Sequence, residues 1–321
     1  MNEILNKTTE FSKSRLFEQY VRSNPVVLVD VGARGGIHSR WNVIGRNIRV
    51  VGFEPDAEEC RKLNEKSEDN HIYFPFALYD RDGMVDINIM QNLACSSVYV
   101  PNSLLIQRFP IADDYKVTNR SRIECHRIDE ILKLNNIQNV DFLKVDTQGS
   151  EMRILEGAKE TLKSYVFGID IELEFLPLYK QQPLFSDVDE YLREYGFVLF
   201  DLNLARLKRK EYTKVYSKGQ VLWAHAVYFK DFLSDKNWGP DSYFCFEKAI
   251  KSIAIVELYG FPDFALELLD FYKNKRIIDP GIYKDIKDIL IKDIPSTGYL
   301  MLKNIFSILK KYLRKIIPSL L

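Results

Sequence analysis

The sequence predicts a doubly wound α/β fold, in which helices cover both faces of a mostly parallel sheet. Two observations predict it: seven apolar runs have the length and composition of strands, and helical patterns fall between most of them. The runs are apolar on both faces, as strands are in a parallel sheet that is buried from both sides. A chain of 321 residues, 46% of them hydrophobic, can bury such a core.

The predicted elements alternate along the chain. The strands are expected at residues 26–31, 48–53, 71–78, 141–145, 166–173, 197–202 and 222–229. The helices between them are expected at residues 56–66, 128–134, 151–162 and 186–195. No clear helix separates the last two strands, so we expect them to form an antiparallel hairpin at the edge of the sheet.

Further segments flank or interrupt this alternation. Residues 1–24 hold an N-terminal helix that ends before Pro25, because proline disfavours the α region for the residue before it. Within the sheet domain, residues 25–232, an insertion over 80–125 is expected to cover the ligand cleft, since long loops in compact domains are usually functional. Three helical patterns predict a helical appendage over 233–295, and a basic tail follows at 296–321.

The overall composition argues against several classes of protein. Lys and Arg balance Asp and Glu at 45 each, so nothing in the totals points to nucleic acid as a partner. The four cysteines show neither a CxxC pair nor metal-ligand spacing, which is typical of reduced thiols in a cytoplasmic protein. The sequence has no signal peptide and no apolar stretch of about 18 residues, so we expect a cytoplasmic location without a membrane span.

The loop after the first strand predicts a ligand site. Asp30, Gly32, Gly35 and Gly36 lie where doubly wound sheets bind ligands, and glycines let the backbone approach a ligand closely. The next helix is expected to direct its free N–H groups at the same space. Glu54 ends the second strand, where a carboxylate can accept both hydroxyls of a ribose. Together these residues predict a cofactor that contains adenosine.

Two cofactors compete for this site. A dinucleotide would favour GxGxxG, but the loop reads Gly32-Ala33-Arg34-Gly35-Gly36, and Asp30 would repel a pyrophosphate. Asp30 suits instead the ammonium group of a methionine moiety, directly or through water, so S-adenosylmethionine is the better ligand. A tight turn with a surface acid would explain either acid alone, but it explains their joint placement poorly.

Three motifs resemble those of the FkbM-type S-adenosylmethionine-dependent methyltransferases: DVGARGG at 30–36, GFEPD at 52–56 and FLKVDTQGSEMRILEGA at 142–158. The segment 171–202 is similar to a branch associated with bacterial surface-glycan genes, and the resemblance covers roughly residues 25–275. It implies the class I methyltransferase (Rossmann-like) fold for 25–232. Two residues depart from the pattern: Gln148 replaces the middle acid of D-x-E-G-x-E, and Arg34 stands where a small polar residue is common.

The resemblance also implies which residues hold the cofactor. Asp30, Gly32 and Gly36 would line its methionine part and Glu54 its ribose, while Ala77 and Leu78 would flank adenine or serve as plain core residues. The full expected cofactor set is Asp30, Gly32, Ala33, Gly35, Gly36, Glu54, Pro55, Asp56, Ala77, Leu78 and Asp146.

Methylation of an alcohol requires an aligned nucleophile and a base or metal that removes its proton. Asp146 is the first candidate base. Glu172 lies among acids at every second position of 170–174, which share one strand face, and it is expected to contact substrate or a metal unless it forms a structural salt bridge. His225 could act as a general base or lie satisfied in the core. A divalent metal ion stays an open alternative.

The tail at 296–321 has basic residues, no acid and apolar residues at helical spacing. Such a helix can lie at an anionic membrane surface, or it can pack on its own domain or on a second copy in a homo-oligomer.

The sequence therefore predicts a cytoplasmic methyltransferase, peripheral at the membrane if the tail binds lipid. Its expected reaction is O-methylation of a sugar hydroxyl in a surface polysaccharide or in a nucleotide- or lipid-linked precursor. The alternatives are an NAD(P)-dependent oxidoreductase and a non-catalytic scaffold in a glycan assembly complex.

Overall fold

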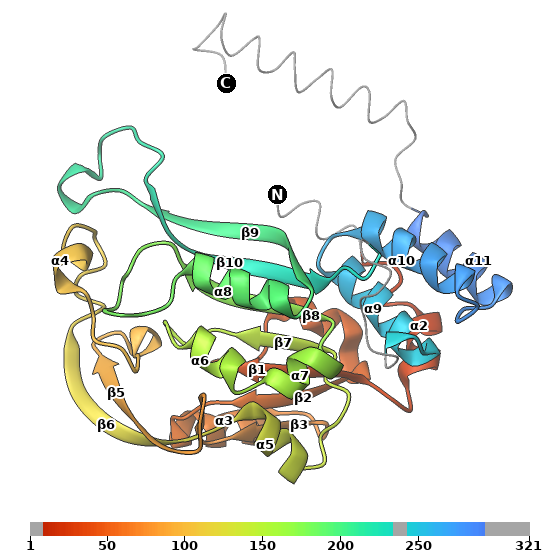
Figure 1. The fold of residues 1–321 in the computed structure, drawn as a ribbon, viewed down its shortest axis with the longest axis horizontal. Helices are drawn as coiled ribbons and strands as arrows, with labels where there is room; N and C mark the ends of the chain where they lie inside the picture. Colours follow the sequence, from red (N-terminus) through yellow and green to blue (C-terminus); the bar gives the residue numbers. More distant parts are fainter. Residues whose placement is uncertain (1–8, 234–242, 293–321) are drawn as a thin grey trace, which may run out of the picture.

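The structure, a computed structural model, describes residues 9–233 and 243–292 (Figure 1). Its central sheet has seven strands in the order β3-β2-β1-β7-β8-β10-β9. The strands are β1 (Val26–Val31), β2 (Ile48–Phe53), β3 (His71–Phe74), β7 (Phe142–Val145), β8 (Gly168–Glu174), β9 (Phe197–Leu207) and β10 (Gln220–Lys230). The predicted α/β class with a mostly parallel sheet of seven strands is confirmed.

The last two strands reverse the direction of the sheet. β10 is antiparallel to both of its neighbours, β8 and β9. The predicted hairpin is therefore present, with β9 at the sheet edge and β10 inside it. Because β10 alone runs the other way, β9 ends at the same edge of the sheet as β1, β7 and β8.

Alternate residues of the strands point into two separate hydrophobic cores. Val27, Val29 and Val31 pack in one core with helices α5 to α8, whereas Val26 and Leu28 pack in the other. The helices of the first core are α5 (Ile128–Leu134), α6 (Glu151–Glu156), α7 (Lys159–Ser164) and α8 (Phe185–Glu194). Those of the second are α2 (Arg15–Val21), η1 (Ser39–Asn47), α3 (Ala57–Lys66), α9 (Phe246–Leu258), α10 (Pro262–Asn274) and α11 (Pro280–Leu290). Both faces of the sheet are thus covered.

Helix α9 lies inside the second core. Every residue from Lys248 to Leu258 is buried, as expected of a helix that is surrounded by other elements. It contacts α2 on one side and α10 on another (Figure 1). The helices expected after residue 232 therefore pack directly on the sheet.

A small second sheet stands beside the first. It has the order β4-β6-β5, with β4 (Ala77–Leu78), β5 (Gly83–Met90) and β6 (Val117–His126). Between and beyond these strands lie η2 (Leu93–Cys95), α4 (Ser103–Ile106) and η3 (Lys210–Tyr212). The expected insertion, 80–125, thus supplies β5 and most of β6.

Three expected elements differ in the structure. The strand predicted over 71–78 is two strands, because Pro75 interrupts it and β4 pairs with β6 instead. The helix predicted over 151–162 is broken into α6 and α7 at Gly157, where a Cβ atom would lie 2.2 Å from the carbonyl oxygen of Tyr79. The helix expected after the glycine loop is the 3₁₀ helix η1, which is kinked at Gly45.

The predicted tail, 296–321, lies outside the described residues. In the part of the chain that the structure describes, no helix has both the length and the hydropathy needed to cross a membrane.

Candidate functional site

A cavity of about 490 Å³ lies at the carboxyl ends of β1, β2 and β7. Seven of the residues expected to hold the cofactor line it: Gly32, Glu54, Pro55, Asp56, Ala77, Leu78 and Asp146. Its other wall is apolar and comes from the small sheet and η2, through Val85, Ile87, Ile89, Leu93 and Ile123. A ligand in this cavity would contact polar groups of the strand ends on one side and apolar side chains of 80–125 on the other.

Gly32 allows two loops of the site to meet. It has a φ of 77°, and a Cβ atom on it would lie 2.0 Å from the carbonyl oxygen of Asp146. Only glycine therefore permits the loop after β1 to lie against the loop after β7. The Lys144 ammonium group donates a hydrogen bond to the Gly32 carbonyl oxygen at 3.0 Å and fixes this contact.

Asp30 lies behind the cavity wall. Its side chain is buried, and one carboxylate oxygen is 3.2 Å from Lys144 Nζ. Burial raises the pKa of Asp30 to about 6, although Lys144 opposes the shift. Lys144 thus pairs with Asp30 in this structure, and the expected contact of Asp30 with the methionine ammonium group, directly or through water, stays a prediction.

Three other expected cofactor residues also lie away from the cavity lining. Ala33 is 1% exposed and belongs to the core, and the N–H of Gly35 donates to Glu59 Oε1 at 3.2 Å. A Cβ atom on Gly36 would approach Leu63 of α3. These residues shape the turn after β1 and are not among those that line the cavity.

Glu54 and Asp56 form a polar group with Arg34 at the ribose end of the predicted site. Glu54 is 4% exposed, and its Oε1 accepts a hydrogen bond from the Asp56 N–H at 2.9 Å. Arg34 Nη2 is 2.8 Å from Asp56 Oδ2 and 3.5 Å from Glu54 Oε1. Burial raises the pKa of Glu54, and the Asp56 N–H and Arg34 oppose this shift. Arg34 thus holds both acids in place beside the cavity.

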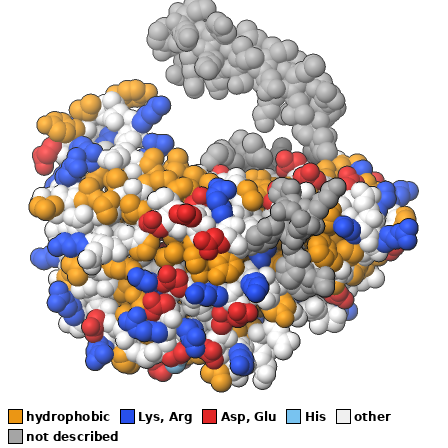
Figure 2. All heavy atoms as spheres, viewed as in Figure 1, with side chains coloured by type: hydrophobic (Ala, Val, Ile, Leu, Met, Phe, Trp, Pro, Cys, Tyr) orange, Lys and Arg blue, Asp and Glu red, His pale blue; other side chains and the backbone are white. Residues whose placement is uncertain are grey.

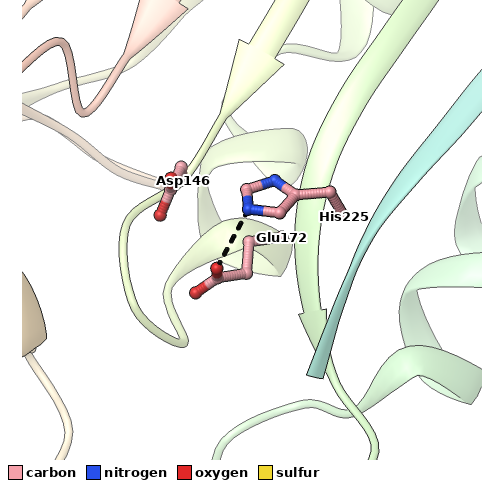
Figure 3. A group of neighbouring side chains, drawn as sticks. All are labelled: Asp146, Glu172 and His225. Atoms are coloured by element: carbon pink, nitrogen blue, oxygen red, sulfur yellow. Dashed lines mark ion pairs between the residues drawn. The ribbon is translucent and has the colours of Figure 1, made fainter. Parts of the chain in front are cut away.

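The three expected catalytic residues come together (Figure 3), and one of them, Asp146, lines the cavity. Asp146 follows β7, Glu172 lies on β8 and His225 on β10, and each offers a ligand atom within 4.8 Å of the others. His225 Nε2 is 3.4 Å from Glu172 Oε2, and its Nδ1 is 3.9 Å from Asp170 Oδ1. We call Asp146, Glu172 and His225 the acid–histidine cluster.

Gln148 joins the two acids of this cluster. Its Nε2 donates to Glu172 Oε1 at 2.5 Å and lies 3.4 Å from Asp146 Oδ1. Its own Oε1 accepts a hydrogen bond from the Tyr179 hydroxyl at 3.3 Å. The backbone of Gln148 has a φ of 58°, which is uncommon for a residue other than glycine and is often found at functional sites. The amide that departs from the family motif is thus a bridge within the site.

Further buried acids surround the cluster. Burial raises the pKa of Glu172 to about 8, and the neighbouring charges of Asp146 and Glu151 add to the shift. Burial likewise raises the pKa of Glu151 to about 7 and that of Glu174 well above its usual value. Lys144 Nζ is 3.8 Å from Asp146 Oδ2 and is also paired with Asp30. The site therefore carries an excess of acidic groups and favours a cationic ligand.

Several residues that line or build the site were not expected from the sequence. Lys144, Phe76 and Thr147 line the cavity with Arg34. Lys144 had one usable signal, because it is the only charged residue in the strand FLKV and lies two residues before Asp146. Glu151 accepts local hydrogen bonds from the N–H and the hydroxyl of Thr147, whereas its proximity to Glu174 depends on the packing of α6 against β8 and has no local signal in the sequence.

The acid–histidine cluster also has the side chains that a divalent cation could use. Two carboxylates and an imidazole suit a metal such as Mn²⁺, and no other group of this kind occurs among residues 9–233 and 243–292. In the present arrangement the Gln148 amide lies between the two acids.

Comparison with known protein families shows which family this chain belongs to. The model of the methyltransferase FkbM domain matches residues 30–199, which include the glycine loop, Glu54, Asp146 and Glu172. The chain belongs to the FkbM methyltransferase family. This assignment confirms the resemblance read from the motifs and decides against the oxidoreductase alternative.

Individual proteins similar to this FkbM methyltransferase carry related chemistry in their names. It is 27% identical over 180 residues to the 2-O-methyltransferase NoeI of Sinorhizobium fredii, a match that covers 52% of this chain and 71% of the relative. It also aligns with the precorrin-6y C5,15-methyltransferase of Geobacter metallireducens at 13% identity and a TM-score of 0.35, covering 67% and 86% of the two chains. For the 1,6-didemethyltoxoflavin-N1-methyltransferase of Burkholderia thailandensis the identity is 12% and the TM-score 0.30, covering 72% and 82%.

The site of this FkbM methyltransferase fits its methyl donor, S-adenosylmethionine. Glu54 can accept the ribose hydroxyls, and Ala77 and Leu78 offer apolar contact to adenine. The acidic surroundings suit a donor that carries a sulfonium and an ammonium charge. The chain is therefore a methyltransferase that uses S-adenosylmethionine.

Proposed function

We propose that this methyltransferase methylates a hydroxyl group of a sugar in a surface polysaccharide or in its nucleotide- or lipid-linked precursor. The observation that carries the proposal is the acid–histidine cluster, because a hydroxyl needs a base beside the methyl donor and Asp146 both lines the cavity and belongs to the cluster. The name of the relative NoeI, a 2-O-methyltransferase, supports an oxygen acceptor.

The roles of the residues follow from their places. S-adenosylmethionine supplies a methyl group on a positively charged sulfur. Asp146 takes the proton of the acceptor hydroxyl, since its side chain is 29% exposed and faces the cavity. Glu172, whose side chain is only 10% exposed, and His225 hold the acceptor beside it. Gln148 fixes the spacing of the two acids through its amide.

A methyl-transfer assay with a panel of nucleotide-linked and lipid-linked sugars tests the proposal. We expect a product heavier by one methyl group that survives mild alkali, as an ether does and an ester does not. Replacing the base, Asp146→Asn, should slow transfer by roughly 100-fold or more while the protein still binds S-adenosylhomocysteine. The exposed control Asp86→Asn should keep the full rate.

Two results would count against this function. Methylation at nitrogen or carbon would show a different acceptor class. Binding of S-adenosylhomocysteine without transfer to any acceptor of the panel would favour the scaffold alternative.

A cation bound at the acid–histidine cluster could replace the base by lowering the pKa of the acceptor hydroxyl. We favour the base, because the Gln148 amide already lies between Asp146 and Glu172. The rate should then be unchanged after dialysis against EDTA. A rate that falls in EDTA and returns with Mn²⁺ would assign a metal to the cluster instead.

A further inference from the structure

The connection between β9 and β10 forms a basic tip beyond the sheet. We define the hairpin tip as residues 206–219, which contain Arg206, Lys208, Arg209, Lys210, Lys214 and Lys218 but a single acid, Glu211. In Figure 1 this hairpin extends past the upper left end of the sheet, and the same corner of Figure 2 shows basic and hydrophobic side chains next to one another. The tip is therefore a local positive surface on a chain without net charge.

The six cations of the tip have no acidic partner among the described residues. Among the described residues, no ion pair involves any of the six. Lys208 Nζ donates to the carbonyl oxygen of Thr213 at 3.2 Å. The Arg209 guanidinium group packs on Phe109, with its Cζ atom 4.5 Å from the centroid of the ring. The remaining charges are available to anions.

Large apolar and aromatic side chains of the tip are exposed beside these charges. Tyr216 is fully exposed, Tyr212 is 65% exposed and Val215 is 55% exposed. Leu104 of α4, on the segment that supports the tip, is 79% exposed. Tyrosines and aliphatic side chains among lysines are typical of surfaces that enter the headgroup region of a membrane.

The base of the tip is anchored to a neighbouring segment, and the tip lies at the edge of the sheet that carries the site. The Lys210 N–H donates to the Arg108 carbonyl oxygen at 2.9 Å, and Leu207 packs against the core cluster that contains Phe109. Because β9 ends at the same sheet edge as β7, the tip projects from the side on which Asp146 lies.

From these observations we propose that the hairpin tip binds the surface of an anionic lipid membrane, with its lysines on the headgroups and Tyr212, Val215 and Tyr216 inserted between them. The charge of the surface favours anionic lipid, and a projecting tip with exposed apolar side chains suits a flat bilayer better than a nucleic-acid strand, which needs a groove to follow. This inference does not rest on the proposed reaction. It would place the cavity near acceptors that are anchored in the membrane.

Vesicle flotation of the full chain tests the proposal, with phosphatidylcholine vesicles that contain phosphatidylglycerol and with phosphatidylcholine alone. We expect binding only to the anionic vesicles. The variant Lys210→Gln/Lys214→Gln/Lys218→Gln should bind about 100-fold more weakly, and Tyr212→Ser/Tyr216→Ser should also weaken binding. The control Lys66→Gln/Lys133→Gln/Lys159→Gln removes the same charge elsewhere and should bind as the wild type does.

Three outcomes would overturn the proposal. The wild type could fail to bind anionic vesicles, or it could bind RNA in preference to them. Binding could also persist in the tip variants and disappear only when the basic residues of the tail, Lys303, Lys310, Lys311, Arg314 and Lys315, are replaced. Circular dichroism of each variant separates loss of binding from loss of the fold.

Discussion

At the scale of single residues, two acids of the site, Glu54 and Asp30, have different surroundings. Glu54 and Asp30 both looked like ligand contacts in the sequence, yet Glu54 lines the cavity while Asp30 is bound by Lys144. A strand ending on an acid is visible in a sequence. The lysine that neutralises the acid comes from a strand more than a hundred residues later, so the difference between these two acids could not be predicted.

Replacing Glu54 by glutamine should weaken cofactor binding. The substitution keeps an acceptor for the Asp56 N–H but removes the charge that would receive the ribose hydroxyls, so we expect S-adenosylhomocysteine to bind about tenfold more weakly. Isothermal titration measures the change. Glu58→Gln, on the exposed part of α3, is the control and should leave affinity unchanged. Equal affinity in Glu54→Gln would remove this residue from the cofactor site.

Substitution of Gly32 by alanine should destabilise the protein more than the same change at Gly35. Both glycines have positive φ, at 77° and 80°, so both variants carry similar backbone strain. Only at Gly32 would the new Cβ atom meet a backbone oxygen, at 2.0 Å, whereas at Gly35 it meets nothing within 4 Å. Thermal melting of the two variants measures the difference. An equal loss of melting temperature in both would show that the close approach of the loops after β1 and β7 is not needed for stability.

At the scale of elements, the order and type of the main strands could be predicted, and the breaks within elements were harder to predict. The run HIYFPFAL reads as one apolar strand, although Pro75 within it was a signal for the break between β3 and β4. Gly157 gave a weaker signal, because its effect depends on the Tyr79 carbonyl oxygen. The acid–histidine cluster required the order β7-β8-β10, which a single sequence suggests only through a family resemblance.

The end of β10 should make stability depend on pH. Lys230 is 2% exposed, and burial lowers its pKa to about 7. Between that value and the ordinary pKa of 10.5, the unfolded chain binds more protons than the folded chain, so stability rises with pH. For this one group, the free energy of unfolding rises by at most about 1.4 kcal/mol per pH unit.

Urea unfolding between pH 7 and pH 10 checks this slope. In Lys230→Met the rise should be smaller than in the wild type, even though the carbonyl oxygen of Leu162 loses its donor. If the free energy of unfolding changed with pH in the same way in both proteins, the ammonium group of Lys230 would stay charged in the folded state.

At the scale of the whole molecule, a buried ionic group connects the sheet to the C-terminal helices. Asp141, just before β7, is 2.6 Å from Lys248 Nζ and 3.0 Å from Lys251 Nζ, and it also accepts the N–H of Val27. All three charged residues are at most 6% exposed. Helix α9 is thus joined to the sheet by charge as well as by apolar packing.

Removing this carboxylate should therefore destabilise the entire domain. In Asp141→Asn two buried ammonium groups lose their counter-charge, and we expect a loss of about 3–5 kcal/mol in the free energy of unfolding. Chemical denaturation monitored by tryptophan fluorescence and by circular dichroism measures it. The exposed control Asp201→Asn should change little, and a similar small effect in Asp141→Asn would mean that the lysines are solvated or neutral.

The interior position of α9 also sets an order of events during synthesis. The apolar face of the sheet that includes Val26 and Leu28 lies in one core with α9, whose residues are translated about two hundred positions later. Until the ribosome has released that segment, this core is incomplete and exposes apolar surface, open to aggregation and to capture by chaperones. The methyltransferase domain can become native only after translation has passed far beyond the last residue of its own family motif.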